Sequence, residues 1–299
     1  EAVAEPKRDK RVDDPETAVL LVSDWQLGKK TPTYSTEVCA KRVALFADRI
    51  RRLVGIQRAD RPIRRAVVPL LGDLVEGELI FPGQEHRIDA SLFRQVMLDG
   101  PEILGGLLRS FLSEFDEVVV HDVIGNHGSL GGRGRKSYHP ESNADAMLYH
   151  ATALALRGRP GNRLVHSVES RLKWELNYRP GERAWHRVFA IGQHNYFMFH
   201  GDQMRGGGFA GIPFYGFMRA INNWGGGVIK EPFRFALCGH WHQLSSLTVN
   251  GRILWIGGST ESDNEWLREE LKSQAPPGQW LLFAHDRRGV TVEHRVWLS

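Results

Sequence analysis

Cysteine is scarce in this sequence, with only Cys39 and Cys238 among 299 residues. Two cysteines cannot supply the disulfide framework on which small secreted domains depend, so we expect a reducing compartment. Long apolar runs are also missing, because none approaches the roughly 18 residues of a membrane-spanning helix. No signal-peptide pattern opens the chain. These absences predict a cytoplasmic protein with no membrane partner.

A strong excess of either charge is missing as well. The 39 basic and 35 acidic side chains give a formal net charge of +4, and the pI is about 9.1. Basic residues concentrate locally, since residues 49–65 contain seven arginines and one aspartate. Such a run is typical of a solvated helix face and turn, and the alternative is a patch that faces phosphate groups.

Internal repeats and long low-complexity tracts are absent, and nothing marks a boundary between domains. The charged residues 1–17 predict a tail or linker, and residues 18–299 predict a single domain. Helical patterns at 36–54, 89–115 and 142–157 follow the early strands, and strands dominate after residue 244. This order predicts an α/β fold with a mixed sheet system covered by helices. The main apolar segments that predict buried strands are 18–24, 66–73, 117–128, 195–202, 235–242 and 252–259.

Polar side chains stand at the ends of five of these predicted strands. A strand-terminal Asp is usually a turn or helix cap, and a lone His beside apolar residues is usually a core residue. However, alternate residues of an extended segment point the same way, which favours convergence of His240 and His242. Because strand ends form the ligand crevice of α/β sheets, the whole set predicts a functional site. Its members are Asp24, Asp73, Asn126, His127, His200, His240 and His242.

These side chains are a chemically coherent set of metal ligands. Carboxylate, amide oxygen and imidazole suit Mn²⁺, Fe²⁺ or Zn²⁺, and the scarcity of cysteine excludes an all-thiolate site. An aspartate can bridge two ions roughly 3.5–4 Å apart, as in centres that catalyse in-line displacement at phosphorus. Two cations polarise the phosphoryl oxygens and lower the pKa of a shared water. The ligand set therefore predicts a phosphoesterase.

The ordered motifs DWQ, GDLVE, GNHG, HGD and GHWH resemble the calcineurin-like metallophosphoesterase superfamily, over roughly residues 19–260. The segments VEGELIFPGQ, HGDQMRGGGFAG and GGSTESDNEW are similar to phage-encoded members and, more distantly, to double-strand-break repair nucleases. The resemblance implies a four-layer αββα sandwich, with two mixed β-sheets flanked by helices and a dinuclear centre at the strand ends. It also implies that the protein is located in the host cytoplasm if it is phage-encoded.

The resemblance further implies a role for each ligand of the first metal. Asp73 would be the carboxylate that bridges both ions. Asp24 and His242 would hold the first metal, with Gln26 in the place of a histidine. Gln26 lacks the basic nitrogen of imidazole, although its amide oxygen could bind a metal or its amide could hydrogen-bond a metal-bound water. We therefore expect a weaker first site, filled only at high metal concentration or with substrate present.

The second metal and the catalytic imidazole follow from the same resemblance. Asn126, His200 and His240 would hold the second metal, and His127 would stabilise the transition state or protonate the leaving oxygen. The expected cofactor is a pair of divalent ions, foremost Mn²⁺, with Fe²⁺, Zn²⁺, Ni²⁺ or Mg²⁺ as alternatives. Many family members have a glutamate where this chain has Gly128. Glu76 is expected to support the ligands rather than to bind a metal.

Loops rich in glycine and positive charge flank the predicted centre at 128–136, 204–211 and 222–227. Glycine lets backbone amides approach phosphate closely, and cationic side chains neutralise a nucleic-acid backbone. Aromatic side chains of the same region could stack on bases, although core packing is their commoner role; they are Phe209, Tyr215, Trp224 and Trp241. The expected substrate-binding residues are Arg133, Arg135, Lys136 and Arg205.

Three functions fit this pattern. The first is a phosphodiesterase or nuclease that cleaves DNA by in-line attack of a metal-bridging hydroxide on phosphorus. Its partners would be DNA and an ATPase or another replication or recombination protein. The second is a hydrolase of small phosphoesters such as nucleotides. The third is a non-catalytic binding or scaffold protein on the same fold, which Gln26 alone supports and which the retention of the other ligands with His127 disfavours.

Overall fold

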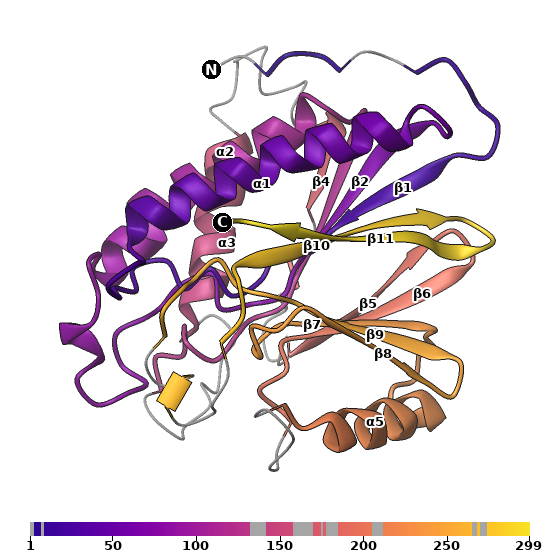
Figure 1. The fold of residues 1–299 in the computed structure, drawn as a ribbon. Helices are drawn as coiled ribbons and strands as arrows, with labels where there is room; N and C mark the ends of the chain where they lie inside the picture. Colours follow the sequence, from indigo (N-terminus) through magenta and orange to yellow (C-terminus); the bar gives the residue numbers. More distant parts are fainter. Residues whose placement is uncertain are drawn as a thin grey trace.

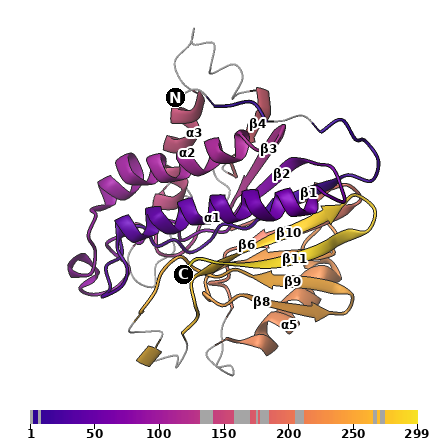
Figure 2. The same ribbon diagram turned by 45° about the horizontal axis from the view of Figure 1, so that its top comes forward.

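Two mixed β-sheets and the helices outside them make up the computed structural model (Figures 1 and 2). The first strand begins at Glu16, and residues 9–15 contain no helix or strand. The division into a tail and a single domain stays a prediction. The structure describes residues 3–6, 9–131, 142–157, 170–174, 176–177, 185–204, 212–264, 268–269 and 274–299.

The first sheet has the strand order β11–β10–β1–β2–β3–β4. Strands β1 to β4 pair in parallel, whereas β10 is antiparallel to both β1 and β11. Parallel neighbours need crossover connections, and these are the helices that cover the outer face. The strands are β1 (Glu16–Leu20), β2 (Ile63–Leu70), β3 (Glu117–Asp122), β4 (Leu172–Trp174), β10 (Gly278–His285) and β11 (Gly289–Trp297).

Helix α1 (Thr36–Gln57) connects β1 to β2, and α2 (Asp99–Leu112) precedes β3. Helix α1 begins after Ser35, whose hydroxyl accepts a hydrogen bond from the Val38 amide, as expected of a helix N-cap. A short 3₁₀ turn, η1 (Gln84–His86), and a π-helical turn, η2 (Arg94–Leu98), precede α2, and α3 (Ala144–Arg157) follows β3.

The second sheet has the order β5–β6–β7–β9–β8. Its central pairs β6–β7 and β7–β9 are parallel, and both outer pairs are antiparallel. Helix α5 (Phe214–Asn223) and the π-helical turn η5 (Trp224–Val228) lie between β6 and β7 in the sequence. The strands are β5 (His186–Ile191), β6 (His194–Phe199), β7 (Phe235–Cys238), β8 (Ser245–Val249) and β9 (Arg252–Ile256).

Among the residues that the structure describes, three apolar cores separate four layers. In β1, Ala18 and Leu20 belong to the core under α1 to α3, whereas Val19 belongs to the core between the two sheets. This division follows from the alternation of side chains along a strand, and it explains why β1 is apolar throughout. The third core joins the second sheet to Phe217 and Ile221 of α5. The predicted four-layer α/β fold is therefore confirmed (Figure 1).

The glycine-rich segment 222–227 is not the loop that the sequence predicts. It ends α5 and forms most of η5. The Trp224 ring packs against Phe197 and Phe199, with ring centroids 5.2 and 5.0 Å away. The apolar spacing of Phe217 and Ile221 outweighs the glycine signal, because it buries one face of a helix against the sheet.

The arginine-rich run at 49–65 is engaged in ion pairs within the chain. Arg58 pairs with Glu114, and Arg61 pairs with Asp14 and Glu16. Arg65 Nε lies 2.9 Å from Glu117 Oε1. These contacts support the structural interpretation of the run over that of a patch that faces phosphate.

Cys39 and Cys238 are free, and they are buried in two different cores. They contribute apolar packing and cannot pair with each other across the layers. Within the described ranges, no helix is long and apolar enough to cross a membrane.

Candidate metal centre

The predicted ligands follow the carboxyl ends of parallel strands in both sheets. Asp24 follows β1, Asp73 follows β2 and Asn126 follows β3. His200 comes directly after β6, and His240 comes two residues after β7. Because the central strands of each sheet are parallel, these ends lie at one edge, and the side chains of the two sheets meet there.

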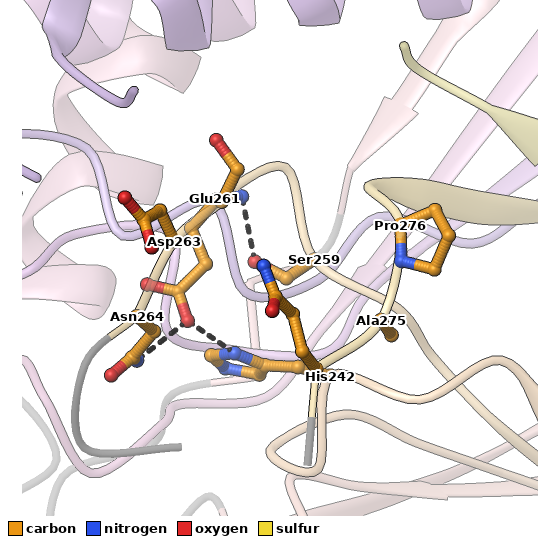
Figure 3. Close-up of a pocket in the computed structure, with 9 residues that line it drawn as sticks. His242, Ser259, Glu261, Asp263, Asn264, Ala275 and Pro276 are labelled. Carbon is orange, nitrogen blue, oxygen red and sulfur yellow. Dashed lines mark hydrogen bonds and ion pairs between the residues drawn. The ribbon is translucent and has the colours of Figure 1, made fainter. Parts of the chain in front are cut away.

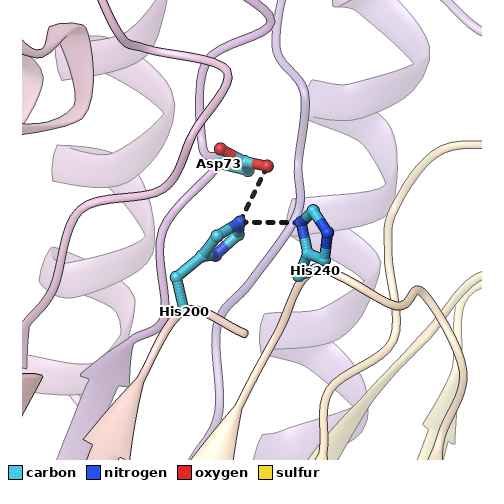
Figure 4. A group of neighbouring side chains, drawn as sticks. All are labelled: Asp73, His200 and His240. Carbon is cyan, nitrogen blue, oxygen red and sulfur yellow. Dashed lines mark hydrogen bonds and ion pairs between the residues drawn. The ribbon is translucent and has the colours of Figure 1, made fainter. Parts of the chain in front are cut away.

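Three ligand-type atoms converge around Nε2 of His200. It lies 3.0 Å from Asp73 Oδ2 and 3.3 Å from His240 Nδ1 (Figure 4), and 3.1 Å from Asn126 Oδ1. The other ring nitrogen of His200 is 2.7 Å from the Leu71 carbonyl oxygen, so in the neutral ring it carries the hydrogen and donates it. Nε2 of His200 then offers a lone pair, as do the two oxygens.

This cluster fits a divalent cation. Asp73, His200 and His240 each offer a ligand atom within 4.8 Å of the others. The buried Asp73 Oδ2 accepts no hydrogen bond in the part of the chain that the structure describes. With His200 neutral, the facing lone pairs of this buried site repel one another, and either a proton on His200 or a cation bound between them removes the repulsion. Oxygen and imidazole ligands suit Mn²⁺, Fe²⁺ or Zn²⁺.

The charges of the centre shift the pKa values of its histidines. Burial disfavours the protonated form of His200, but Asp73 and Asp24 outweigh burial and raise its pKa to about 10. Burial and the neighbouring His200 lower the pKa of His240 to about 4. Burial alone would raise the pKa of Asp73, but His200 and His127 hold it well below its usual range. A bound cation replaces the proton on His200, since a ligand nitrogen must be deprotonated.

Asp24 and His242 form a second pair of converging candidate ligands. His242 Nε2 lies 3.3 Å from Asp24 Oδ1, and the backbone amide of His240 donates to both Asp24 oxygens at 3.0 and 2.9 Å. His242 Nδ1 lies 2.7 Å from Glu261 Oε1, which also accepts a hydrogen bond from Asn264 at 2.8 Å (Figure 3). A carboxylate on the far ring nitrogen fixes the tautomer and orientation of a metal-binding imidazole.

Glu261 was not among the predicted site residues, although it lies in the segment GGSTESDNEW that carries part of the resemblance. It follows β9, as His200 and His240 follow β6 and β7, so it shares the strand-end signal of the predicted ligands. Glu261 is 4% exposed. Burial disfavours the protonated His242, but Glu261 and Asp24 raise its pKa to about 10.

Gln26 turns its amino group toward the centre. Lys29 Nζ lies 2.7 Å from Gln26 Oε1, and Gln26 Nε2 lies 3.2 Å from His242 Nε2 and 3.4 Å from His127 Nε2. Lysine can only donate, so the network assigns the atom next to it as oxygen. The Asp24–His242 pair fits a cation, whereas the amino group of Gln26 does not.

His127 lies beside the cluster and is oriented by Glu76. Its Nδ1 is 3.2 Å from the Glu76 carbonyl oxygen and 3.1 Å from the Glu76 carboxylate, and its backbone amide donates to Asp73 Oδ1 at 2.8 Å. Burial disfavours the imidazolium, but Glu76 and Asp73 raise the pKa of His127. Glu76 thus supports His127, and the exposed ring of Phe81 packs edge-on against it at 5.2 Å.

Asp145 fixes the two loops that carry Asp73 and Asn126. Its carboxylate accepts hydrogen bonds from the backbone amides of Asp73, Leu74 and Gly125, at 2.9, 2.9 and 2.8 Å. The side chain is fully buried, and burial together with the charge of Asp73 raises its pKa to about 6. Asp145 was not among the residues predicted from the sequence.

Replacing Asp145 with alanine should destabilise the fold and weaken metal binding together. The change leaves several buried amide groups without an acceptor, and each such group costs about 1–3 kcal/mol. We expect the free energy of unfolding, measured with urea, to fall by about 3 kcal/mol or more. Asp48→Ala is the matched control, because its ion pair with Arg51 is solvent-exposed. Equal stability of both variants would contradict the bracing role of Asp145.

Backbone strain concentrates at the candidate ligands. The left-handed region of φ is rare for residues other than glycine, and it clusters at functional sites. Two glycines allow the close approach of the strand ends, because a Cβ at Gly125 would lie 2.0 Å from Asp73 Oδ1 and one at Gly239 would lie 2.5 Å from Asp24 Oδ2. The candidate site residues with φ between 47° and 71° are Asp24, Gln26, Asp73, His240 and His242.

The predicted substrate-binding residues lie outside the described residues, as does Phe209; they are Arg133, Arg135, Lys136 and Arg205. Of the other aromatic candidates, Tyr215 is 77% exposed. Trp241 packs edge-on against Phe217 and His240, with centroids 6.1 and 5.2 Å away.

No protein-family model matches the sequence, and no curated protein matches it. Among solved structures, vacuolar protein sorting 29 from Cryptosporidium parvum is 15% identical, with 95% of this chain and 100% of that chain covered and a TM-score of 0.42. A hypothetical protein from Pyrococcus horikoshii OT3 is 10% identical, with 95% and 89% covered and a TM-score of 0.44. A novel archaeal phosphodiesterase is 8% identical, with 93% and 99% covered and a TM-score of 0.39. Similarities this low do not assign an activity.

Proposed function

We propose that this protein is a metal-dependent phosphoesterase. The observation that carries the proposal is the cluster of Asp73, Asn126, His200 and His240 around an unsatisfied carboxylate oxygen, with His127 beside it. An ion with a purely structural role would need only the cluster of ligands, with no acid or base beside it. An oriented imidazole at the edge of the same cluster supplies an acid or base next to a cation, which is what hydrolysis of a phosphoester requires.

The cation would be held by Asp73, Asn126, His200 and His240, where its charge polarises a phosphoryl oxygen and lowers the pKa of water. The residues of the chain provide the remaining chemistry. Glu76 holds the hydrogen on Nδ1 of His127, so Nε2 is the ring nitrogen that faces the centre. When protonated at Nε2, His127 can donate that proton to the leaving oxygen as its bond to phosphorus breaks.

We propose DNA as the substrate and Mn²⁺ as the physiological ion, with a second and more weakly bound ion at Asp24 and His242. The basic glycine-rich loop that follows GNHG in the sequence supports a nucleic-acid substrate, because cationic loops beside a metal centre attract a phosphate backbone. The exposed Phe81 beside His127 offers a face on which a base could stack. An ATPase or another replication or recombination protein is the proposed partner.

The direct test compares four substrates in the presence of Mn²⁺. They are a chromogenic phosphodiester, the corresponding monoester, and end-labelled single-stranded and double-stranded DNA. We expect hydrolysis of the diester and of DNA, and we expect removal of the metal with EDTA to abolish it because no protein group replaces the cation. Restoring Mn²⁺ after dialysis should restore the rate.

Two outcomes would contradict this proposal in different ways. If the monoester or nucleotides are hydrolysed while DNA is left uncleaved, the nuclease function is excluded and a hydrolase of small phosphoesters is favoured. No hydrolysis with Mn²⁺, Fe²⁺, Zn²⁺, Ni²⁺ or Mg²⁺ would exclude the phosphoesterase and favour a binding or scaffold protein.

A further inference from the structure

Lys29 places a positive charge next to the Asp24–His242 pair. Its Nζ lies 2.6 Å from Glu261 Oε2 and 2.7 Å from Gln26 Oε1, and its side chain is only 14% exposed. A tight turn brings it there, since its backbone amide donates to the Gln26 carbonyl at 3.0 Å and Gly28 has φ +97°. The neighbouring Lys30 is exposed.

The charge of Lys29 interacts with the carboxylates of the candidate metal centre. Burial disfavours its ammonium group, but the carboxylates of Glu261, Glu76 and Asp73 outweigh burial and raise its pKa. Glu261 is shared between Lys29, through Oε2, and His242, through Oε1. A fixed cation in a poorly solvated site repels a metal ion that enters nearby, because the interaction is weakly screened.

Lys29 also locks the amide of Gln26 in the wrong orientation for a metal ligand. The ammonium holds Oε1, so the amino group must face His242 Nε2 at 3.2 Å and His127 Nε2 at 3.4 Å. Both imidazoles have an acceptor at Nδ1, namely Glu261 for His242 and Glu76 for His127. When either ring is neutral, its Nε2 atom is therefore the acceptor that the amino group requires.

We infer that the centre binds one divalent ion tightly, at Asp73, Asn126, His200 and His240, and that the Lys29 ammonium supplies the second positive charge in place of a tightly bound second ion. The inference rests on the metal binding proposed above. Gln26 connects this charge to His127 and His242 and keeps both rings oriented. Gln26 and Lys29 thus act together: Lys29 supplies the positive charge, and Gln26 transmits its orientation to the two imidazoles.

The test counts bound Mn²⁺ in the metal-free protein titrated with Mn²⁺, by calorimetry and by electron paramagnetic resonance. We expect the wild-type protein to bind one Mn²⁺ tightly, with the spectrum of isolated ions. Lys29→Met removes the charge and frees the Gln26 amide to rotate its oxygen inward. The second ion should then bind at least about tenfold more tightly, because a full repelling charge has gone, and the spectrum should become that of a coupled pair. Lys30→Met is the matched control and should behave as wild type.

Two ions of equal affinity with a coupled spectrum in the wild-type protein would overturn the inference, and this result does not depend on the folding of any variant. A folded Lys29→Met protein with the same count and affinities as Lys30→Met would also overturn it. Absence of Mn²⁺ binding by all three proteins would contradict the proposed function itself.

Discussion

Asp73→Asn should abolish tight metal binding and also lower the stability of the metal-free protein. Asp73 Oδ2 faces His200 Nε2 at 3.0 Å and has no hydrogen bond among the described residues. Loss of this negatively charged ligand should weaken Mn²⁺ binding by more than about 100-fold, since even groups that only support ligands contribute 10–100-fold. Hydrolysis at limiting Mn²⁺ should fall in parallel.

The stability of the Asp73→Asn variant follows from the same geometry. Asparagine keeps an oxygen that can accept from the His127 amide, and its amino group can donate to the lone pair of His200 Nε2. These hydrogen bonds do not replace the ion pair between Asp73 and the protonated His200, so near pH 7 the metal-free variant should unfold at a lower urea concentration than wild type. Calorimetry with Mn²⁺ and urea unfolding in EDTA measure the two effects.

Asp122→Asn is the matched control for this substitution. Asp122 is also buried, at the end of β3, but its carboxylate accepts from Trp174 Nε1 at 2.8 Å and contacts none of the candidate ligands in any described interaction. Mn²⁺ affinity should be unchanged in this variant. Wild-type Mn²⁺ affinity in Asp73→Asn would show that Asp73 is not a ligand.

His127→Ala should slow hydrolysis by about 10²–10⁴-fold, the usual contribution of a general acid, without changing Mn²⁺ affinity. The His127 ring lies beside the ligands, and its Nε2 is 4.0 Å from Asp73 Oδ2, farther away than the Nε2 of His200. Its nearest partners are Glu76 and Gln26, neither of which we place among the ligands of the tightly bound ion. Initial rates at saturating Mn²⁺, together with calorimetry, separate the two effects.

His86→Ala provides the control for this variant, because the His86 side chain is 83% exposed in the turn η1. Its rate should equal that of wild type. A wild-type rate in His127→Ala would remove this residue from the reaction. A parallel loss of Mn²⁺ affinity would instead make His127 a metal ligand.

The sequence by itself determined the strand ends and the chemistry that they carry. Buried parallel strands must be apolar throughout, so Asp24, Asp73 and His200 stand out where the apolar runs stop. Local backbone chemistry adds to this signal, because Gly125 and Gly239 are required where the strand ends approach each other. The α/β class and the convergence of the predicted ligands could thus be predicted from residue patterns alone.

Other strands and helices depended on tertiary packing. Strand β4 has only three residues, and α5 is followed in η5 by glycines that indicated a loop. Both form because neighbouring layers cover their apolar side chains. Such short segments contain too few residues for their hydrophobic periodicity to be recognised in the sequence.

The tertiary structure alone decided how the ligands are held and charged. Asp145 accepts amides from two loops that are about fifty residues apart in the sequence, and no local pattern encodes such a contact. The orientation of the Gln26 amide depends on Lys29, and the position of Lys29 depends on Glu261, more than 200 residues later. A glutamine in isolation offers either an oxygen or an amino group. Only the charges that surround it in the folded protein select which one faces the centre.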